Sequence, residues 1–246
     1  MNELRNTKTV ITGVNGDIAF NVAKLFHKNG SNLILFAKKK TAALSKFITK
    51  KNVLIFYGDL CDEKFIKESL VSIKLKYKKI DFIINCAGRV SFEKIENISL
   101  NNWNQIINDN LTSTFLITKY LLKVLKKNSS SSIVNISSIA GRKYSQLAGT
   151  HYTASKAGVI GFTRQLSIEL SKYKIRVNSI APGQVNSNML NNAMEINNLK
   201  KSDLTKLIPL GRLAEPSDIA NCCAFLCSSN SLYITGTTID INGGLL

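Results

Sequence analysis

The 246-residue chain has little of several residue types that mark specialised proteins. Only three prolines are present, so no proline-rich linker divides the chain, and we expect a single domain over residues 1–246. There are two histidines and five cysteines, and the cysteines form no C-x-x-C pair. These counts argue against a zinc site, and we expect no metal.

Long hydrophobic runs are also missing. The apolar runs fall well short of the roughly 20 residues that a membrane-spanning helix needs, so we expect no membrane partner. The first five residues, MNELR, contain no apolar core of a secretory signal. Because an odd number of cysteines without such a signal fits a reducing compartment, we expect a cytoplasmic protein whose cysteines are small core residues.

Acidic residues are few. The chain has 16 Asp and Glu against 33 Lys and Arg, which gives a net charge of +17. An excess of this kind can attract nucleic acid or an acidic protein partner. The basic residues are mostly Lys, they are scattered along the chain, and no nucleic-acid recognition motif accompanies them. We therefore expect no nucleic-acid binding, while an acidic partner remains compatible with the charge.

The chain is rich in short apolar segments that alternate with helical ones. Residues 81–85 are apolar throughout their interior, which is typical of a parallel sheet covered on both faces. The alternation predicts an α/β protein, a single-domain Rossmann fold with a doubly wound parallel sheet and helices on both faces. The expected strands are 8–12, 32–37, 52–57, 80–85, 132–137, 175–181 and 238–241. The expected helices are 17–28, 42–49, 63–77, 103–127, 151–173 and 217–228, and the polar segment 186–208 is expected to be an irregular substrate lid.

Residues 12–19, TGVNGDIA, join the first expected strand to the first helix. In α/β folds, ligands bind beyond the carboxyl ends of the strands, and a pyrophosphate prefers a helix N-terminus. Gly13 and Gly16 allow the backbone to approach such a ligand. Asp17 can cap the helix, although its charge would repel a pyrophosphate. The segment predicts a dinucleotide-binding turn.

Tyr152 and Lys156 lie one turn apart on one face of an expected helix. A nearby ammonium favours the phenolate, so we expect it to lower the pKa of the Tyr by about 1–3 units from its ordinary value near 10. Ser138 follows the fifth expected strand, and Ser137 remains an alternative because adjacent strand residues face opposite sides. Asn110 lies inside a helix, where Asn is a mediocre helix former.

Together these segments resemble the short-chain dehydrogenase/reductase family along essentially the whole chain. The resemblance implies a catalytic tetrad of Asn110, Ser138, Tyr152 and Lys156. Two positions depart from the family, because Asp17 and Ala19 stand where it has glycine. The cofactor-binding residues that the resemblance and the turn imply are Gly13, Asn15, Gly16, Asp17, Ile18, Lys38, Asp59, Leu60, Asn85, Ala87, Gly88, Tyr152, Lys156, Pro182, Gly183, Val185 and Ser187.

The resemblance also implies a reaction, the transfer of hydride between a nicotinamide and a carbonyl carbon. In reduction, Tyr152 would donate a proton to the oxygen, while Ser138 would hydrogen-bond that oxygen. Lys156 would lower the pKa of the Tyr and hold the nicotinamide ribose. Asn110 would hold a water that relays protons to the lysine.

The second expected strand ends in LFAKKK, which contains no acid that could bind the ribose hydroxyl of NAD. Lys38 falls where NADP-dependent relatives carry Arg, so NADP(H) is expected to be preferred over NAD(H). The segments that are most similar to β-ketoacyl-acyl-carrier-protein reductases are 133–141, 156–162, 176–183 and 211–216. They imply a carbonyl substrate that is a small molecule or is bound to acyl carrier protein.

Two alternatives remain open from the sequence. Dehydrogenases of sugars, polyols and secondary metabolites share all of these segments, and a Rossmann protein could bind a nucleotide without catalysis. The apolar content of the helices expected at 103–127 and 151–173 predicts a homo-oligomer, which the resemblance implies is a homotetramer.

Overall fold

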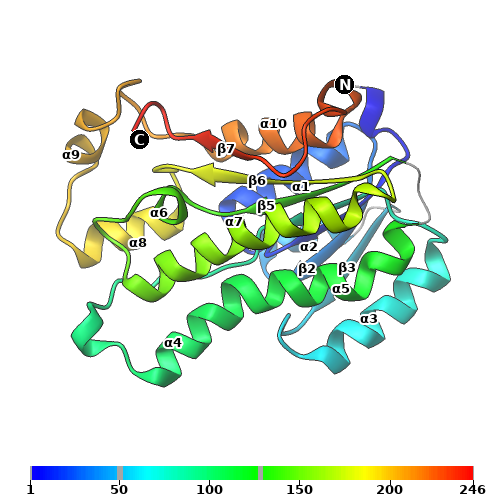
Figure 1. The fold of residues 1–246 in the computed structure, drawn as a ribbon, viewed down its shortest axis with the longest axis horizontal. Coiled ribbons are helices and arrows are strands. Elements are labelled where there is room, and N and C mark those ends of the chain that lie inside the picture. The colour runs from blue at the N-terminus through cyan, green and yellow to red at the C-terminus, as the bar shows by residue number, and fades with distance from the viewer. Residues whose placement is uncertain (1, 49–51, 127–129, 246) are drawn as a thin grey trace.

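The computed structural model describes residues 2–48, 52–126 and 130–245. Its strands form one parallel sheet in the order β3-β2-β1-β4-β5-β6-β7. The sheet has helices on both faces, which confirms the predicted doubly wound α/β fold (Figure 1). The strands are β1 Lys8–Thr12, β2 Asn32–Ala37, β3 Val53–Tyr57, β4 Phe82–Asn85, β5 Ser131–Ile136, β6 Ile175–Pro182 and β7 Thr238–Ile241.

Two helical layers cover the sheet, and each buries its own apolar cluster. One layer contains α1 Asp17–Lys28, α2 Ala42–Ile48 and α10 Pro216–Cys227, and its cluster includes Phe26 and Cys223. The other contains α3 Glu63–Lys76, α5 Ser113–Leu125 and α7 Thr150–Ser171, and its cluster includes Leu121 and Leu166. Because both faces are covered, the central strands are almost completely buried, including polar residues such as Asn135 on β5 and Asn178 on β6. The short helices are η1 Asn2–Leu4, η2 Ile95–Asn97, α6 Ile139–Arg142 and η4 Ser229–Ser231.

The strand order reverses at β1, which pairs with β2 on one side and with β4 on the other. The turns that follow β1 and β4 are locked together there. The Thr12 hydroxyl accepts the N–H groups of Cys86 and Ala87 at 3.0 and 3.1 Å. Gly13 has a φ of +74°, and a Cβ on it would lie 2.6 Å from the Ala87 Cα. Only glycine allows this approach, and ligands of open α/β sheets bind at such a reversal point.

The helix predicted at 103–127 is divided in the structure. It consists of α4 Leu100–Ile107, a π-helical turn Asn108–Thr112 and α5. Asn and Asp are weak helix formers, and π-helical turns are frequent at functional sites, so the run Asn108-Asp109-Asn110 was a signal for the break. The predicted ends at Lys127 here and at Thr49 in the second helix lie outside the described residues.

The segment 186–208 is not irregular, as the sequence predicted, but forms α8 Asn188–Ile196 and α9 Lys201–Lys206. The Ser187 hydroxyl caps α8 by accepting the N–H of Leu190. Leu190 and Leu204 are buried in a small apolar cluster of their own. The Asn-rich sequence conceals this pattern, because Asn is a weak helix former and recurs between the apolar residues. No helix among the described residues is long and apolar enough to cross a bilayer.

Candidate active site

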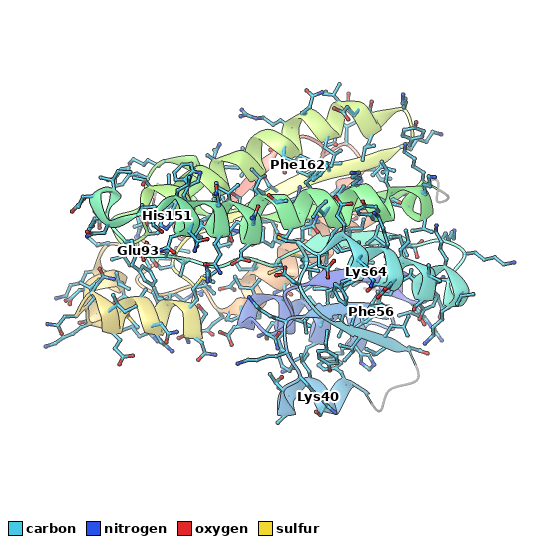
Figure 2. The ribbon with its side chains drawn as sticks, turned by 90° about the horizontal axis from the view of Figure 1, so that it is seen from below. Lys40, Phe56, Lys64, Glu93, His151 and Phe162 are labelled. Atoms are coloured by element: carbon cyan, nitrogen blue, oxygen red, sulfur yellow. The ribbon has the colours of Figure 1, made fainter. Side chains whose placement is uncertain are left out.

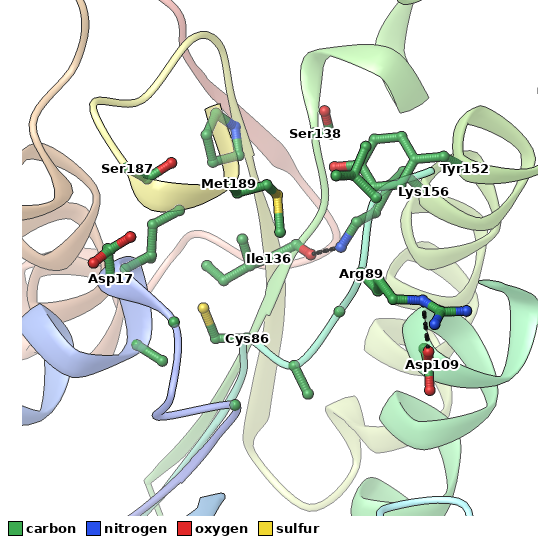
Figure 3. Close-up of a pocket in the computed structure, with 18 of the residues that line it drawn as sticks. Asp17, Cys86, Arg89, Asp109, Ile136, Ser138, Tyr152, Lys156, Ser187 and Met189 are labelled. Atoms are coloured by element: carbon green, nitrogen blue, oxygen red, sulfur yellow. Dashed lines mark hydrogen bonds and ion pairs between the residues drawn. The ribbon is translucent and has the colours of Figure 1, made fainter. Parts of the chain in front are cut away.

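A cavity of about 480 Å³ lies at the carboxyl edge of the sheet, over the reversal point between β1 and β4. Asp17 and Ser187 lie on one side of it, and Ser138, Tyr152 and Lys156 lie on the other (Figure 3). Most predicted site residues line this cavity: Gly13, Asn15, Gly16, Asp17, Ile18, Lys38, Asp59, Leu60, Ala87, Gly88, Ser138, Tyr152, Lys156, Pro182, Gly183, Val185 and Ser187. Asn85 and Asn110 do not line it.

Ser138 and Tyr152 meet at one end of the cavity. Ser138 lies two residues after the end of β5, and its hydroxyl accepts the N–H of Ala140 at 3.1 Å as the N-cap of α6. Tyr152 lies in the first turn of α7 and is 8% exposed. Burial raises the pKa of Tyr152, and a smaller opposing effect comes from its side-chain hydrogen bond with Ser138.

The expectation that an ammonium lowers the pKa of Tyr152 is therefore wrong for this structure. Lys156 Nζ lies 5.8 Å from the centroid of the Tyr152 ring and donates instead to the carbonyl of Ile136 at 3.0 Å (Figure 3). Burial of the phenol is therefore the larger effect on the pKa of Tyr152, and it raises that pKa. The Tyr152 phenol stays protonated at neutral pH, which is the form that can donate a proton.

Lys156 is itself almost completely buried, with 5% of its surface exposed. Burial lowers the pKa of its ammonium to about 8. A Cβ on Gly88 would lie 3.2 Å from Lys156 Nζ, so the glycine leaves room for the lysine. Lys156 consequently changes charge close to physiological pH.

The two candidate serines differ in what their hydroxyls contact. The Ser137 hydroxyl donates to the backbone carbonyl of Lys156 at 2.8 Å, and Ser137 is 3% exposed. The Ser138 hydroxyl is the one that contacts Tyr152. This placement favours Ser138 as the serine of the tetrad.

Asn110 lies in the π-helical turn and is fully buried behind the cavity. Its Oδ1 accepts the N–H of Arg89 at 2.7 Å, while its Nδ2 donates to the Arg89 carbonyl at 3.0 Å and to the Ser155 hydroxyl at 2.8 Å. These bonds hold the segment that follows β4 beside Lys156. The role of Asn110 in a proton relay stays a prediction.

Asn85 was predicted to contact the cofactor, but its side chain does not face the cavity. Its Nδ2 donates to Asn135 Oδ1 at 2.9 Å and to the Thr118 hydroxyl at 3.1 Å. Asn85 and Asn135 are register partners on β4 and β5, so both amides lie in the same buried layer of the sheet. Asn85 therefore supports the end of β4 rather than lining the site.

At the far end of the cavity, Asn15 holds the segment after β2 in place. Its Oδ1 accepts the N–H groups of Lys38 and Lys39 at 2.8 and 3.2 Å, and its Nδ2 donates to the Lys39 carbonyl at 2.8 Å. Of these two lysines, Lys38 lines the cavity and Lys39 does not. Asp59 lines the same end, with its carboxylate accepting the N–H of Cys61 at 2.8 Å.

Asp17 does not cap α1, because Gly16 holds the N-cap position. The Asp17 carboxylate instead accepts two hydrogen bonds from Asn188, one from its backbone N–H at 2.8 Å and one from its Nδ2 at 3.2 Å. No local pattern could have revealed this pair, since the two residues are 171 positions apart. Sequence reasoning also missed the ion pair at 3.2 Å between Arg89 and Asp109, which line the cavity wall (Figure 3).

The residues present fit a nicotinamide dinucleotide in most respects. Gly16 has no side chain that could cap the first turn of α1, so the helix N-terminus stays available to a phosphate. Lys38 and Lys156 place positive charge at opposite ends of the cavity. Asp17 is the exception, because its carboxylate lies where an anionic ligand would approach α1.

Comparison with known proteins gives consistent matches along the chain. A family model described as enoyl-(acyl carrier protein) reductase matches residues 13–246. The 3-oxoacyl-[acyl-carrier-protein] reductase of Chlamydia trachomatis is 33% identical over 98% of both chains. That of Rickettsia conorii is 34% identical over 100% of this chain and 99% of its own.

Two solved structures have the same architecture. The aldohexose dehydrogenase of Thermoplasma acidophilum, in ligand-free form, gives a TM-score of 0.91 at 26% identity and covers 99% of this chain and 95% of its own. A 3-oxoacyl-[acyl-carrier protein] reductase of Brucella melitensis with bound NAD gives a TM-score of 0.86 at 27% identity. The match covers 99% of this chain and 92% of that chain.

The buried ammonium of Lys156 generates a prediction on stability. Its pKa is about 8 in the folded protein against an ordinary 10.5, so the folded state bears the full cost of the charge below pH 8. Replacement by Met removes that cost, roughly 3 kcal/mol, and loses about 1 kcal/mol from the hydrogen bond to Ile136. We expect Lys156→Met to unfold at a higher temperature than the wild type at pH 7.

The higher stability of Lys156→Met over the wild type should shrink toward pH 10. Between pH 8 and 10.5 the unfolded wild type binds more protons than the folded one, so the wild type becomes more stable as the pH rises. Thermal unfolding at both pH values measures this. The matched control is Lys64→Met on the outer helix α3 (Figure 2), which should show no such dependence. A stability difference that does not vary with pH would contradict the prediction.

Proposed function

The chain belongs to the short-chain dehydrogenase/reductase family and is a nicotinamide-dependent oxidoreductase, and we propose that it reduces the 3-oxo group of an acyl chain held on acyl carrier protein. The observation that carries the reaction type is the placement of Ser138, Tyr152 and Lys156 on one side of the cavity, opposite the glycine-containing turn. The full-length similarity to 3-oxoacyl-[acyl-carrier-protein] reductases supports the substrate class.

In the proposed reaction, each polar group at this end of the cavity has one task. When bound, the nicotinamide supplies hydride to the carbonyl carbon of the substrate. Ser138 donates a hydrogen bond to the carbonyl oxygen, which gains negative charge as the hydride arrives. Tyr152 gives its phenolic proton to the same oxygen, which becomes a hydroxyl group. Lys156, which lines the same end of the cavity, would hold the nicotinamide ribose.

The description of the matching family model names another reaction, the reduction of an enoyl group. Enoyl reductases place their Tyr and Lys further apart than Tyr152 and Lys156, which are four positions apart. This spacing puts both side chains at one end of the cavity, next to Ser138. It supports carbonyl reduction over enoyl reduction.

Oxidation of a sugar is the second candidate, favoured by the likeness to an aldohexose dehydrogenase. A substrate panel separates the two functions. We expect turnover with NADPH and an acetoacetyl thioester, on acyl carrier protein or on coenzyme A, and little turnover with aldohexoses and NADP⁺. The reverse result would favour the sugar dehydrogenase, and no turnover with any pair would leave only a nucleotide-binding role.

We also propose a homotetramer whose subunits contact one another through α5 and α7. Phe115 on α5 is 42% exposed, and its ring packs edge-on against Phe162 of α7 with the centroids 6.5 Å apart. Figure 2 labels Phe162 on this helix. An apolar pair on the outer face of two adjacent helices suits an isologous contact. The helices α8 and α9 are the proposed lid over the acyl chain, since Met189 and Leu190 line the cavity.

The tetrad generates a prediction on catalysis. We expect Tyr152→Phe to lower kcat to at most a few per cent of the wild type, because Phe keeps the ring but cannot donate a proton. Ser138→Ala should lower kcat by roughly 10²–10³-fold, the usual effect of losing one oxyanion donor. Ser137→Ala is the matched control and should have a much smaller effect, because its hydroxyl contacts only backbone. A larger loss from Ser137→Ala would reverse the assignment.

The position of Lys38 generates a prediction on cofactor choice. A Lys contact to the 2′-phosphate of NADPH is charge-assisted and favours it over NADH by roughly 1.5–3 kcal/mol. We therefore expect a higher kcat/KM for NADPH in the wild type and a loss of most of this preference in Lys38→Ala. Lys39→Ala should retain it, because Lys39 does not line the cavity. Equal kcat/KM values for both cofactors in the wild type would contradict the proposal.

A further inference from the structure

Asp17 is a charged group of the cavity that the proposed reaction does not use and that opposes a dinucleotide. We propose that Asp17 sets the affinity for the cofactor, because the N-terminus of α8 holds its carboxylate where the cofactor pyrophosphate would approach the N-terminus of α1. This proposal rests on the nicotinamide-dependent activity given above. Other residues of the cavity favour cofactor binding, whereas Asp17 weakens it.

The geometry around Asp17 brings two helix N-termini to one carboxylate. Asp17 is the first residue of α1, and it accepts both the backbone N–H and the Nδ2 of Asn188, the first residue of α8. Figure 3 places Asp17 beside Ser187, the N-cap of α8. Helix N-termini attract anions, since their first N–H groups lack partners within the helix. In this structure the anion between them is a side chain of the protein itself.

Two of the first three N–H groups of α8 therefore already donate to protein side chains. Asp17 takes that of Asn188, and the Ser187 hydroxyl takes that of Leu190. A pyrophosphate is also an anion that needs N–H donors, and its place in this fold is the turn that contains Asp17. The carboxylate is therefore held next to the place of the phosphates and repels them. This repulsion weakens binding and is screened by salt.

The hydrogen bonds of Asp17 have a second effect, on α8. They tie α8, which contributes Met189 and Leu190 to the cavity wall, to the turn after β1. An anion that repels the carboxylate away from Asn188 also removes these hydrogen bonds from the start of α8. Through the Asp17 side chain, cofactor binding is coupled to the position of α8, which contributes Met189 and Leu190 to the cavity wall.

The experiment compares Asp17→Asn, which removes the charge and keeps an acceptor, with Asp17→Gly, which removes both. The control is Glu195→Gln, an exposed carboxylate near the other end of α8 that does not line the cavity. Dissociation constants for NADPH and NADH are measured by fluorescence titration at low and high salt. We expect about tenfold tighter binding of both by Asp17→Asn at low salt, at least as much for Asp17→Gly, and no change in the control. The gap between wild type and Asp17→Asn should narrow at high salt.

Hydrogen exchange of the first amides of α8, measured without nucleotide, tests the same carboxylate independently of binding. Exchange should be faster in Asp17→Gly than in the wild type and unchanged in Glu195→Gln. The proposal would be overturned if the dissociation constants are equal in all variants, or if the difference between wild type and Asp17→Asn does not decrease at high salt. Asp17 would then serve only to connect α1 and α8. If neither nucleotide binds to any of the proteins, the proposed function fails together with this inference.

Discussion

The close approach of the turn after β1 to the turn after β4 is the constraint on which the site depends. Gly13 and the Thr12 hydroxyl fix residues 86 and 87 from one side, and Asn110 fixes Arg89 from the other. The short segment between them passes beneath the ammonium of Lys156, where only glycine fits. The position of the lysine, and with it that of Tyr152 one turn earlier on α7, follows from this packing.

The charge of the cavity differs from that of the whole chain. The chain carries +17, but the charged residues that line the cavity are three bases, Lys38, Arg89 and Lys156, and three acids, Asp17, Asp59 and Asp109. The excess of lysine therefore lies elsewhere on the molecule. Recognition of an anionic cofactor depends on where single charges lie in the cavity, because distant exposed lysines are screened within about 10 Å at 0.1 M salt.

Features encoded in short stretches could be predicted from the sequence. The predicted ends of most strands and helices agree with the structure to within two residues, because each buried strand contains a short run of apolar residues that stands out from the segments around it. The Tyr152 and Lys156 pair could also be found, because its two residues are only four positions apart in the sequence. The hydrogen bonds between Asn188 and Asp17 form only because distant segments of the chain meet in the fold. The raised pKa of Tyr152 depends on burial. Neither is visible in local sequence.

The π-helical turn at Asn108–Thr112 makes this part of the chain sensitive to insertions and deletions as well as to substitutions. A π-helical turn contains one residue more than an α-helical turn, so deleting one residue there would join α4 and α5 into a regular helix. Such a helix would gain regular hydrogen bonds, but the wider turn that places Asn110 against Arg89 would be lost. Asn110 would then turn away from Arg89. A length variant of this segment can therefore have a more regular helix and still lose the support beneath Lys156.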